Sequence, residues 1–136
     1  MSFLLDTCVL SELTRPSPNG RVAEWLLRTD DDLKFTSVLS LSEIRFGILC
    51  SDDGRKKNRL RLWYETDLRP SFGDRVIVFG ENESNRWADL RSRYRNAGVI
   101  DGQIAAIALA HGLSLVTRNV KDFAFEGLDV FNPWEP

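Results

Sequence analysis

The chain has 136 residues and a mass of 15.5 kDa, the size of one domain. Its 43% hydrophobic and 28% charged residues are typical of globular proteins and exclude a disordered or fibrous chain. Eighteen basic and twenty acidic side chains leave a net charge of −2, so bulk charge does not predict attachment to DNA or to a membrane. We therefore expect one domain over residues 1–136.

Rare residue types narrow the possible chemistry. Cys8 and Cys50 are too few for a disulfide framework, and no segment approaches the roughly 18 apolar residues of a membrane span, so we expect a cytoplasmic protein without membrane contacts. The single histidine, His111, cannot build a His-rich zinc site and is expected to complement the C-terminal dipole of a helix. No glycine-rich phosphate-binding motif is present, so any catalytic chemistry must be carried by carboxylates.

Apolar segments alternate with capped or amphipathic segments along the chain. Residues 3–5 predict a buried strand that ends at Asp6, and a helix over 7–13 follows. After a Pro-rich break, the remaining helices are predicted over 22–27, 40–49, 55–68, 82–96 and 101–111, and the remaining strands over 33–38, 75–79, 113–117 and 128–131. Asn82 or Ser84 is expected to cap its helix, and Gly98 and Gly112 to end theirs. This order predicts an α/β domain with a parallel sheet covered on both faces.

Four polar residues fall where strands end or helices begin. Asp6 follows the first strand, and Glu43 is placed in the first turn of the helix after the second strand. Asp101 begins its helix, and Asn119 follows the fourth strand. In parallel α/β units such positions meet at one edge of the sheet. The helix over 101–111 leads away from this edge for about 16 Å, and the strand over 113–117 leads back by about the same length, so Asn119 returns to the level of Asp101. We expect the four side chains to face a single pocket.

Each of these residues also has a purely structural interpretation. Ser40 and Glu43 match a capping box, Asp101 suits a simple N-cap, and Asn119 suits a turn. Asp6 is the hardest to explain in this way, because an Asp at the end of a buried strand is costly to desolvate without a partner. A structural α/β domain whose acidic residues only cap helices is therefore one alternative.

Convergence of three carboxylates would require a counter-charge. Two carboxylates about 4 Å apart repel by roughly 4 kcal/mol at an effective dielectric constant near 20, whereas a helix N-terminus returns only about 0.3–1 kcal/mol per charge. Oxygen ligands without His or Cys favour Mg²⁺, or alternatively Mn²⁺, which typically works on phosphates. The expected reaction class is metal-assisted phosphodiester hydrolysis.

A family resemblance is carried by several segments in order. They read FLLDTCVLSEL, TSVLSLSEIRFGI and DGQIAAIALAHGLSLVTRN, followed by VKDF and FNPW. With them the chain resembles the PIN-domain family, and within it the VapC-like ribonuclease toxins and their FitB-like relatives. The resemblance implies a PIN-like α/β/α sandwich around a parallel sheet of four to five short strands, with an acidic active site.

The resemblance also implies roles for the four polar residues. Asp6 and Asp101 would be the metal ligands, Glu43 would position or deprotonate the attacking water, and Asn119 would orient a ligand or water. Many relatives carry Asp where this chain has Asn119, so one charge is lost. Whether the nearby Asp122 joins the site or only forms a turn is left open, as is the number of metal ions.

Cys8 stands where relatives often carry a small polar residue. We expect it to be a small buried hydrophobe and not a nucleophile.

The partners implied by the resemblance are those of the toxin half of a toxin–antitoxin pair. Such proteins are commonly homodimers blocked by a small VapB-like antitoxin, which binds operator DNA and reaches the acidic pocket with a cationic side chain. Candidates for a partner groove are the aromatic residues Trp25, Phe46, Trp63 and Tyr64, with core packing as the alternative.

Basic side chains are candidates for RNA contacts. Residues 55–61 carry five positive charges, and the next long helix carries Arg86, Arg91, Arg93 and Arg95. A solvated helix face is the usual explanation for such groups, and contact with RNA phosphates is the alternative. The better candidates lie closer to the predicted site and are Arg15, Arg45, Arg118 and Lys121.

The leading hypothesis is a Mg²⁺-dependent endoribonuclease, the toxin of a type II toxin–antitoxin pair. The alternative is a non-catalytic PIN subunit of an antitoxin-containing repressor complex on operator DNA, which Asn119 in place of an acid favours.

Overall fold

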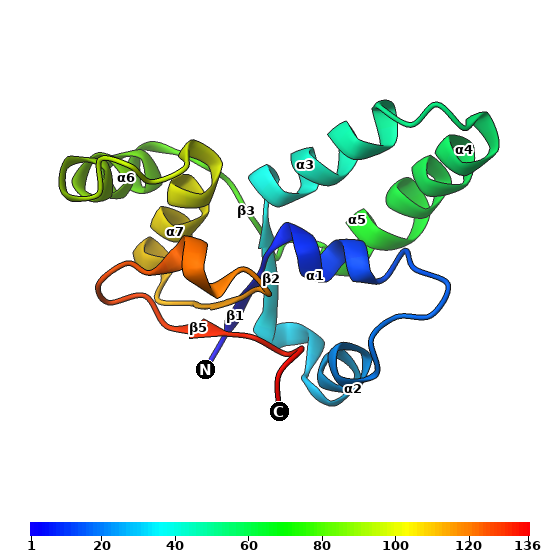
Figure 1. Ribbon diagram of the computed structural model, residues 1–136, viewed down its shortest axis with the longest axis horizontal. Coiled ribbons are helices and arrows are strands. Elements are labelled where there is room, and N and C mark those ends of the chain that lie inside the picture. Colours follow the sequence, from blue (N-terminus) through cyan, green and yellow to red (C-terminus); the bar gives the residue numbers. More distant parts are fainter.

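The computed structural model describes residues 1–136 and places a parallel sheet between layers of helices (Figure 1). Its strands are β1 (Phe3–Leu5), β2 (Lys34–Ser37), β3 (Val76–Ile77), β4 (Ser114–Val116) and β5 (Val130–Phe131). They are all parallel, in the order β3-β2-β1-β4-β5. The predicted α/β sandwich around a central parallel sheet is confirmed, with five strands.

Seven α-helices connect and cover the strands. They are α1 (Thr7–Glu12), α2 (Gly20–Arg28), α3 (Val38–Leu49), α4 (Gly54–Trp63), α5 (Arg69–Phe72), α6 (Glu81–Arg93) and α7 (Val99–His111). A π-helical turn (Tyr64–Leu68) joins α4 to α5, so this helical segment runs four residues beyond its predicted end at Leu68. Short 3-10 turns lie at η1 (Asp31–Leu33) and η3 (Val120–Phe123).

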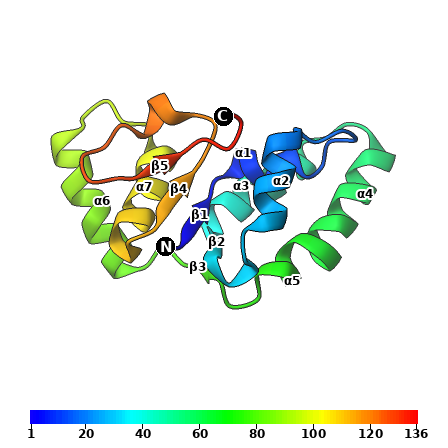
Figure 2. The same ribbon diagram turned by 90° about the horizontal axis from the view of Figure 1, so that it is seen from below.

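The two faces of the sheet belong to two separate hydrophobic cores. Leu4 of β1 and Leu115 of β4 pack with α6 and α7, whereas the next residues, Leu5 and Val116, pack with α1, α2, α3 and α5. This division follows from the alternation of side chains along a strand, and Figure 2 shows the two groups of helices on opposite sides of the sheet. Strands this short supply one or two side chains to each core, so most of the buried apolar surface comes from the helices.

The central strand β1 lies where the order of the sheet reverses. The chain passes from β1 to β2 on one side, and β4 pairs with the other side of β1. In open α/β sheets the crevice at the carboxyl ends of such strands is where ligands bind. The residues that follow β1 and β4, Asp6 and Thr117, are neighbours at this point because Leu5 pairs with Val116.

Both ends of α6 differ from the sequence prediction. Helix α6 begins at Glu81 with Gly80 as its N-cap, not with Asn82 or Ser84, because the Glu83 carboxylate reaches back and accepts a hydrogen bond from the Gly80 N–H (2.9 Å). Gly98 does not end α6, which stops at Arg93, but is the N-cap of α7. Gly112 ends α7 as predicted, in the left-handed conformation (φ 63°).

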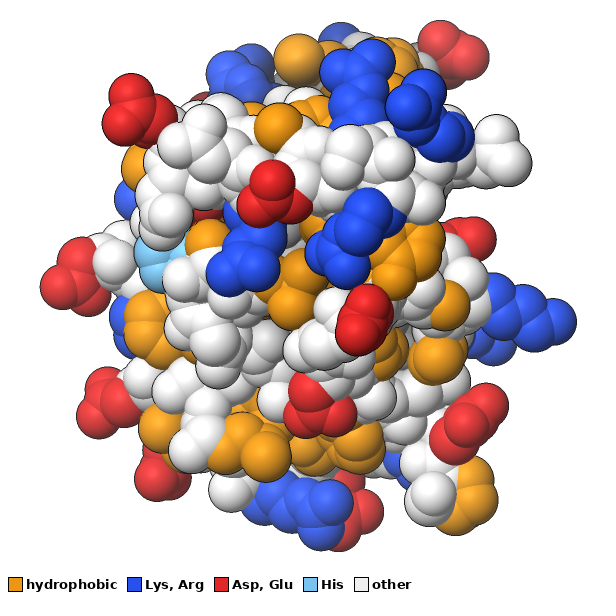
Figure 3. Space-filling model, turned by 90° about the vertical axis from the view of Figure 1, so that its left-hand side faces the viewer, with side chains coloured by type: hydrophobic (Ala, Val, Ile, Leu, Met, Phe, Trp, Pro, Cys, Tyr) orange, Lys and Arg blue, Asp and Glu red, His pale blue; other side chains and the backbone are white.

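His111 lies in the last turn of α7, as expected for a side chain near the negative end of a helix dipole. Its Nε2 also lies 2.6 Å from Oε2 of Glu83, which is buried in the first turn of α6. The pair therefore joins the end of α7 to the start of α6. The outward side of this helical layer carries charged side chains of both signs (Figure 3).

The aromatic candidates for a partner groove divide between core and surface. Trp25 is buried against Phe3, with ring centroids 5.1 Å apart, and Trp63 and Tyr64 pack on the same core. Their assignment to a groove is therefore replaced by the core-packing alternative. Phe46 of α3 is 64% exposed and remains a surface residue. None of the helices has both the length and the apolar character needed to cross a bilayer.

Candidate active site

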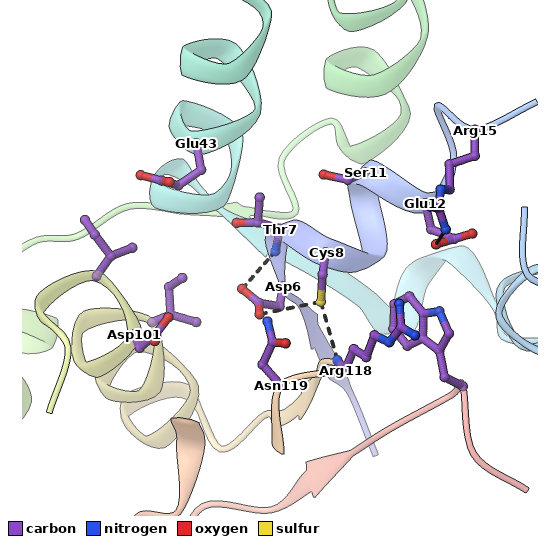
Figure 4. Close-up of a pocket in the computed structure, with 13 residues that line it drawn as sticks. Asp6, Thr7, Cys8, Ser11, Glu12, Arg15, Glu43, Asp101, Arg118 and Asn119 are labelled. Atoms are coloured by element: carbon purple, nitrogen blue, oxygen red, sulfur yellow. Dashed lines mark hydrogen bonds and ion pairs between the residues drawn. The ribbon is translucent and has the colours of Figure 1, made fainter. Parts of the chain in front are cut away.

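A cavity of about 500 Å³ opens at the carboxyl ends of β1 and β4. Its walls include all four polar residues that the sequence analysis placed there: Asp6, Glu43, Asp101 and Asn119 (Figure 4). The elements that carry them are the start of α1, the side of α3, the start of α7 and the turn after β4. Segments separated by more than a hundred residues thus meet around one space.

Asp6 lies at the base of this cavity and is only 5% exposed. It is the N-cap of α1, where Oδ1 accepts a hydrogen bond from the Thr7 N–H (2.8 Å). Its Oδ2 accepts a second one from the hydroxyl of Thr117 (2.8 Å), which is fully buried. Burial raises the pKa of Asp6, and the hydrogen bond from Thr117 opposes this shift. The Cys8 thiol is a third, longer donor to Oδ2 (3.8 Å), so Asp6 is a desolvated carboxylate that is fixed in place by three donors.

Asp101 faces the same cavity from the third position of α7, so it neither begins the helix, as predicted, nor caps it, as the structural alternative had it. The helix begins two residues earlier, at Val99, with Gly98 outside it. Burial raises the pKa of Asp101, and the charges of Asp6, Asp122 and Glu43 raise it further. The other three carboxylates therefore lie close enough to Asp101 to disfavour its ionised form, which agrees with the convergence expected from the sequence.

Glu43 occupies the second turn of α3, so its predicted place in the first turn and its capping box with Ser40 are wrong. The N-cap is Ser37, whose hydroxyl accepts a hydrogen bond from the Ser40 N–H (3.1 Å). Because α3 begins directly after β2, Glu43 lies one turn further along the helix than predicted. Its exposed side chain lies across the cavity from Asp101 (Figure 4).

Asn119 forms a turn and also lines the cavity. Its backbone forms a turn, in which its N–H donates to the Thr117 hydroxyl (3.1 Å) and its carbonyl accepts from the Asp122 N–H (3.0 Å). Its side chain nevertheless lines the cavity. Asp122 follows in η3 and lines an adjoining cavity together with Asp101, so its carboxylate affects the site through its charge.

Cys8 packs against the core that includes α1 and α3, as predicted for a small hydrophobe, but it also makes polar contacts. It is half-buried, its Sγ lies 3.4 Å from the Thr117 hydroxyl oxygen, and it accepts a hydrogen bond from the Arg118 N–H (3.4 Å). Burial raises the pKa of the Cys8 thiol, which keeps it in the protonated, weakly nucleophilic form. The thiol thus serves as a polar contact that ties the turn after β4 to α1.

Two supporting residues were missed by the sequence analysis. Thr117 ends an apolar strand just as Asp6 does, so the reasoning applied to Asp6 could have found it. Glu12 is only 4% exposed, and its Oε2 accepts from the Asn19 N–H (2.8 Å) while Oε1 lies 3.5 Å from the Arg15 guanidinium. The only sign of Glu12 in the sequence is that an acidic residue follows the apolar residues of helix α1. Glu12 holds the loop that carries Arg15 against the cavity.

The donor set suits a hard, hydrated cation. No three His, Cys, Asp or Glu side chains lie close enough together to form a complete metal cage. Asp6 and Asp101 offer carboxylate oxygens whose pKa values are raised by burial, and the charge of Asp122 raises both further. Mg²⁺ is commonly held by one or two carboxylates and keeps several waters, so the residues present fit such an ion.

Comparison with known proteins agrees with this fold and identifies the family. The PIN domain family matches residues 3–125, and the chain belongs to this family. VapC ribonuclease Y4jK of Sinorhizobium fredii is 34% identical over 98% of this chain and 99% of its own length. Toxin FitB of Neisseria gonorrhoeae is 37% identical over 97% of this chain and 98% of its own. A structure of FitAB bound to an IR36 DNA fragment has a TM-score of 0.91 and 35% identity, covering 98% of this chain and 96% of that one.

Proposed function

We propose that this protein is a divalent-metal-dependent endoribonuclease and the toxin of a toxin–antitoxin pair. The observation that carries the proposal is the meeting of Asp6, Glu43 and Asp101 in one cavity, with the pKa values of Asp6 and Asp101 raised by burial and by neighbouring carboxylates. Relatives named as a VapC ribonuclease and as a toxin match the chain over nearly its full length, which supports the same conclusion.

In this proposal each residue has a separate task. Asp6 and Asp101 hold Mg²⁺, with Mn²⁺ as the alternative, and the bound ion supplies Lewis-acid stabilisation of charge on the phosphoryl oxygens. Glu43 accepts a proton from the water whose oxygen bonds to phosphorus, while the P–O bond to the leaving oxygen breaks. Asn119 orients a water or a phosphate oxygen through its amide, and Thr117 keeps the Asp6 carboxylate in position.

Substrate contacts are proposed for the cationic end of the cavity. Arg118 and Arg15 line it, and the Arg118 guanidinium lies over the ring of Trp134, 5.5 Å from its centroid. Single-stranded RNA is commonly bound by phosphate contacts and by stacking on aromatic rings or guanidinium planes. Arg45 does not line the cavity, although its position on α3 made it a candidate.

The same acidic cavity suits an inhibitory partner. A cationic side chain from a VapB-like antitoxin would complement the carboxylates and exclude the metal ion, and DNA would be contacted only through the antitoxin. We propose a homodimer as the toxin form in this complex. The match to FitAB, which has been solved with a DNA fragment, supports such an assembly.

Metal-dependent cleavage is the direct test. We expect the antitoxin-free protein to cut structured RNA in Mg²⁺, to stop when EDTA is added, and to recover when Mg²⁺ is restored in excess. Gel analysis of end-labelled RNA measures this. Cleavage that persists in EDTA and in Asp101→Ala would contradict the proposal.

Binding of the ion can be measured apart from catalysis. We expect Mg²⁺ to raise the melting temperature by mass action, by an amount equivalent to about 2.7 kcal/mol when its concentration is a hundred times its dissociation constant. Asp101→Asn should abolish most of this increase, because it removes one of the two proposed ligands. Asp89→Asn, an exposed acid on α6 outside the cavity, is the matched control and should respond like the unaltered protein. Equal melting temperatures with and without Mg²⁺ would favour the alternative in which the acidic residues only stabilise the fold.

The second candidate function is the non-catalytic subunit of a DNA-bound repressor complex. Asn119, in place of the acid common among relatives, and the solved FitAB–DNA complex favour it. Expression without an antitoxin separates the two functions. A nuclease toxin should arrest growth, and Asp6→Ala should relieve the arrest, whereas a silent subunit should leave growth unchanged.

A further inference from the structure

A second cavity, of about 430 Å³, adjoins the candidate active site at Asp101. It lies between the segment that follows α6 and the turn η3, and its charged and aromatic walls are formed by Arg93, Tyr94, Arg95, Asp101, Lys121 and Asp122. Asp101 lines both cavities. The two hollows therefore meet at one of the proposed metal ligands.

Two of the cations in this second cavity have no acidic partner. The four ion pairs of the protein involve neither Arg95 nor Lys121, and both side chains are exposed. Arg95 donates from Nε to the Ser92 carbonyl (3.3 Å), which leaves its terminal nitrogens free. Arg93, in contrast, is paired with Glu126 at 3.4 Å. The cavity thus offers two unpaired positive charges beside the carboxylates.

The wall behind these cations is fixed by packing. The Tyr94 ring meets Phe125 edge-on, with centroids 4.9 Å apart, and its hydroxyl oxygen accepts a hydrogen bond from the Glu126 N–H (2.9 Å). The Tyr94 carbonyl accepts from the Ala97 N–H (3.1 Å), which closes the turn after α6. Arg95 therefore projects from a turn that is held against the body of the protein.

Cations flank the carboxylates on both sides of the proposed site. Arg15 and Arg118 line the active-site cavity, and Arg95 and Lys121 line the second cavity beyond Asp101. The carboxylates repel a polyanion, so an RNA strand can cross them only if phosphates on either side of the cleaved bond meet positive charges. The arrangement of the two cavities meets this requirement.

We propose, building on the nuclease function above, that the second cavity binds the RNA backbone next to the cleaved bond. Arg95 and Lys121 each contact a phosphate there, while Arg118 contacts the strand on the other side. The proposed ligand is single-stranded RNA, whose backbone is typically bound along positively charged grooves without sequence preference. These contacts set affinity and placement and are independent of base sequence.

Salt dependence of binding tests this proposal without cleavage. A fluorescein-labelled, mixed-sequence, single-stranded RNA 20-mer is titrated with the full-length protein in EDTA at several KCl concentrations, and anisotropy gives the binding constant. Each phosphate contact contributes about 0.7 to the slope of log K against log salt for single strands. We expect Arg95→Ala/Lys121→Ala to reduce the magnitude of this slope by about 1.4. The matched control Arg21→Ala/Arg28→Ala removes two exposed charges from α2, outside both cavities, and should leave the slope unchanged.

The outcomes separate this subsite from the nuclease proposal. A reduced slope for the cavity variant alone supports the subsite, and equal slopes for both double variants overturn it. An unchanged slope together with weakened antitoxin binding also overturns it and assigns the cavity to a protein partner. Cleavage in Mg²⁺ is scored separately on the unaltered protein. Its absence alongside a reduced slope would contradict the nuclease function and leave the RNA subsite supported.

Discussion

Asp6→Asn is expected to lower the rate of RNA cleavage by about a thousandfold while leaving the protein folded. Metal-assisted stabilisation of the transition state is worth several kcal/mol, and roughly 4 kcal/mol corresponds to this factor. The amide keeps the shape of the carboxylate, and its oxygen can still accept from Thr117 or Thr7. The change therefore removes the charge needed to hold the ion and little else. Single-turnover cleavage in saturating Mg²⁺ measures the effect.

Asp6→Asn should lower the rate of cleavage without lowering the stability of the fold. Because burial raises the pKa of Asp6 in the folded protein, its ionised form is disfavoured there. The stability that the protonated side chain contributes is therefore lost as the pH rises through that pKa. At neutral pH without metal, Asp6→Asn should unfold at an equal or higher temperature than the unaltered protein. The difference should shrink as the pH is lowered toward the ordinary pKa of Asp. A large loss of stability would mean that Asp6 serves the fold.

Gly102→Ala is expected to destabilise the protein, although alanine is the better helix former. A Cβ at Gly102 of α7 would lie 2.6 Å from Cη2 of Trp87 on α6, and closer still to Cζ3. Overpacking of a core costs about 1–3 kcal/mol, and more where the neighbour cannot move, whereas the gain in helix propensity is about 1 kcal/mol. Trp87 is buried in the core of this layer, so the steric cost dominates. Urea denaturation should show a lower midpoint with an unchanged m-value.

Gly47→Ala is the matched control for this substitution. Gly47 lies in α3, and a Cβ there would meet no atom within 4 Å. The same change should therefore stabilise the protein by about 0.5–1 kcal/mol. Trp87→Leu should relieve much of the cost of Gly102→Ala, and a double-mutant cycle measures this coupling. Equal effects at Gly102 and Gly47 would show that α6 and α7 separate freely.

The elements were predictable because each has a strong local signal. The apolar run before Asp6 predicted β1, the β-branched segment 75–79 predicted β3, and Gly112 predicted the end of α7. The helix starts were less predictable, because the competing caps differ only in which side chain reaches the free N–H groups. Ser37, Gly80 and Gly98 are N-caps in the structure, and Ser37 and Gly80 depend on contacts made three residues later.

The positions of the four polar site residues could be predicted more fully than the contacts that hold them in place. Helix and strand lengths predict that Asp101 and Asn119 lie at one level, and the end of β1 predicts Asp6 at the same edge of the sheet. The buried hydroxyl of Thr117, the acid of Glu12 and the sulfur of Cys8 act through contacts between segments far apart in the chain. Such pairings depend on sheet register, which a single sequence does not specify. The second cavity depends in the same way on how the turn after α6 meets η3.

The hydrogen bond from Thr117 to Asp6 joins positions 111 residues apart. A ribosome that has made the first hundred residues has therefore produced Asp6 and Glu43 without the strand that orients them. We expect chains truncated before Leu113 to leave RNA intact, since β4 and its turn are missing. If the chain has the proposed nuclease activity, it would thus become active only once its synthesis is nearly complete, when an antitoxin already present could bind it.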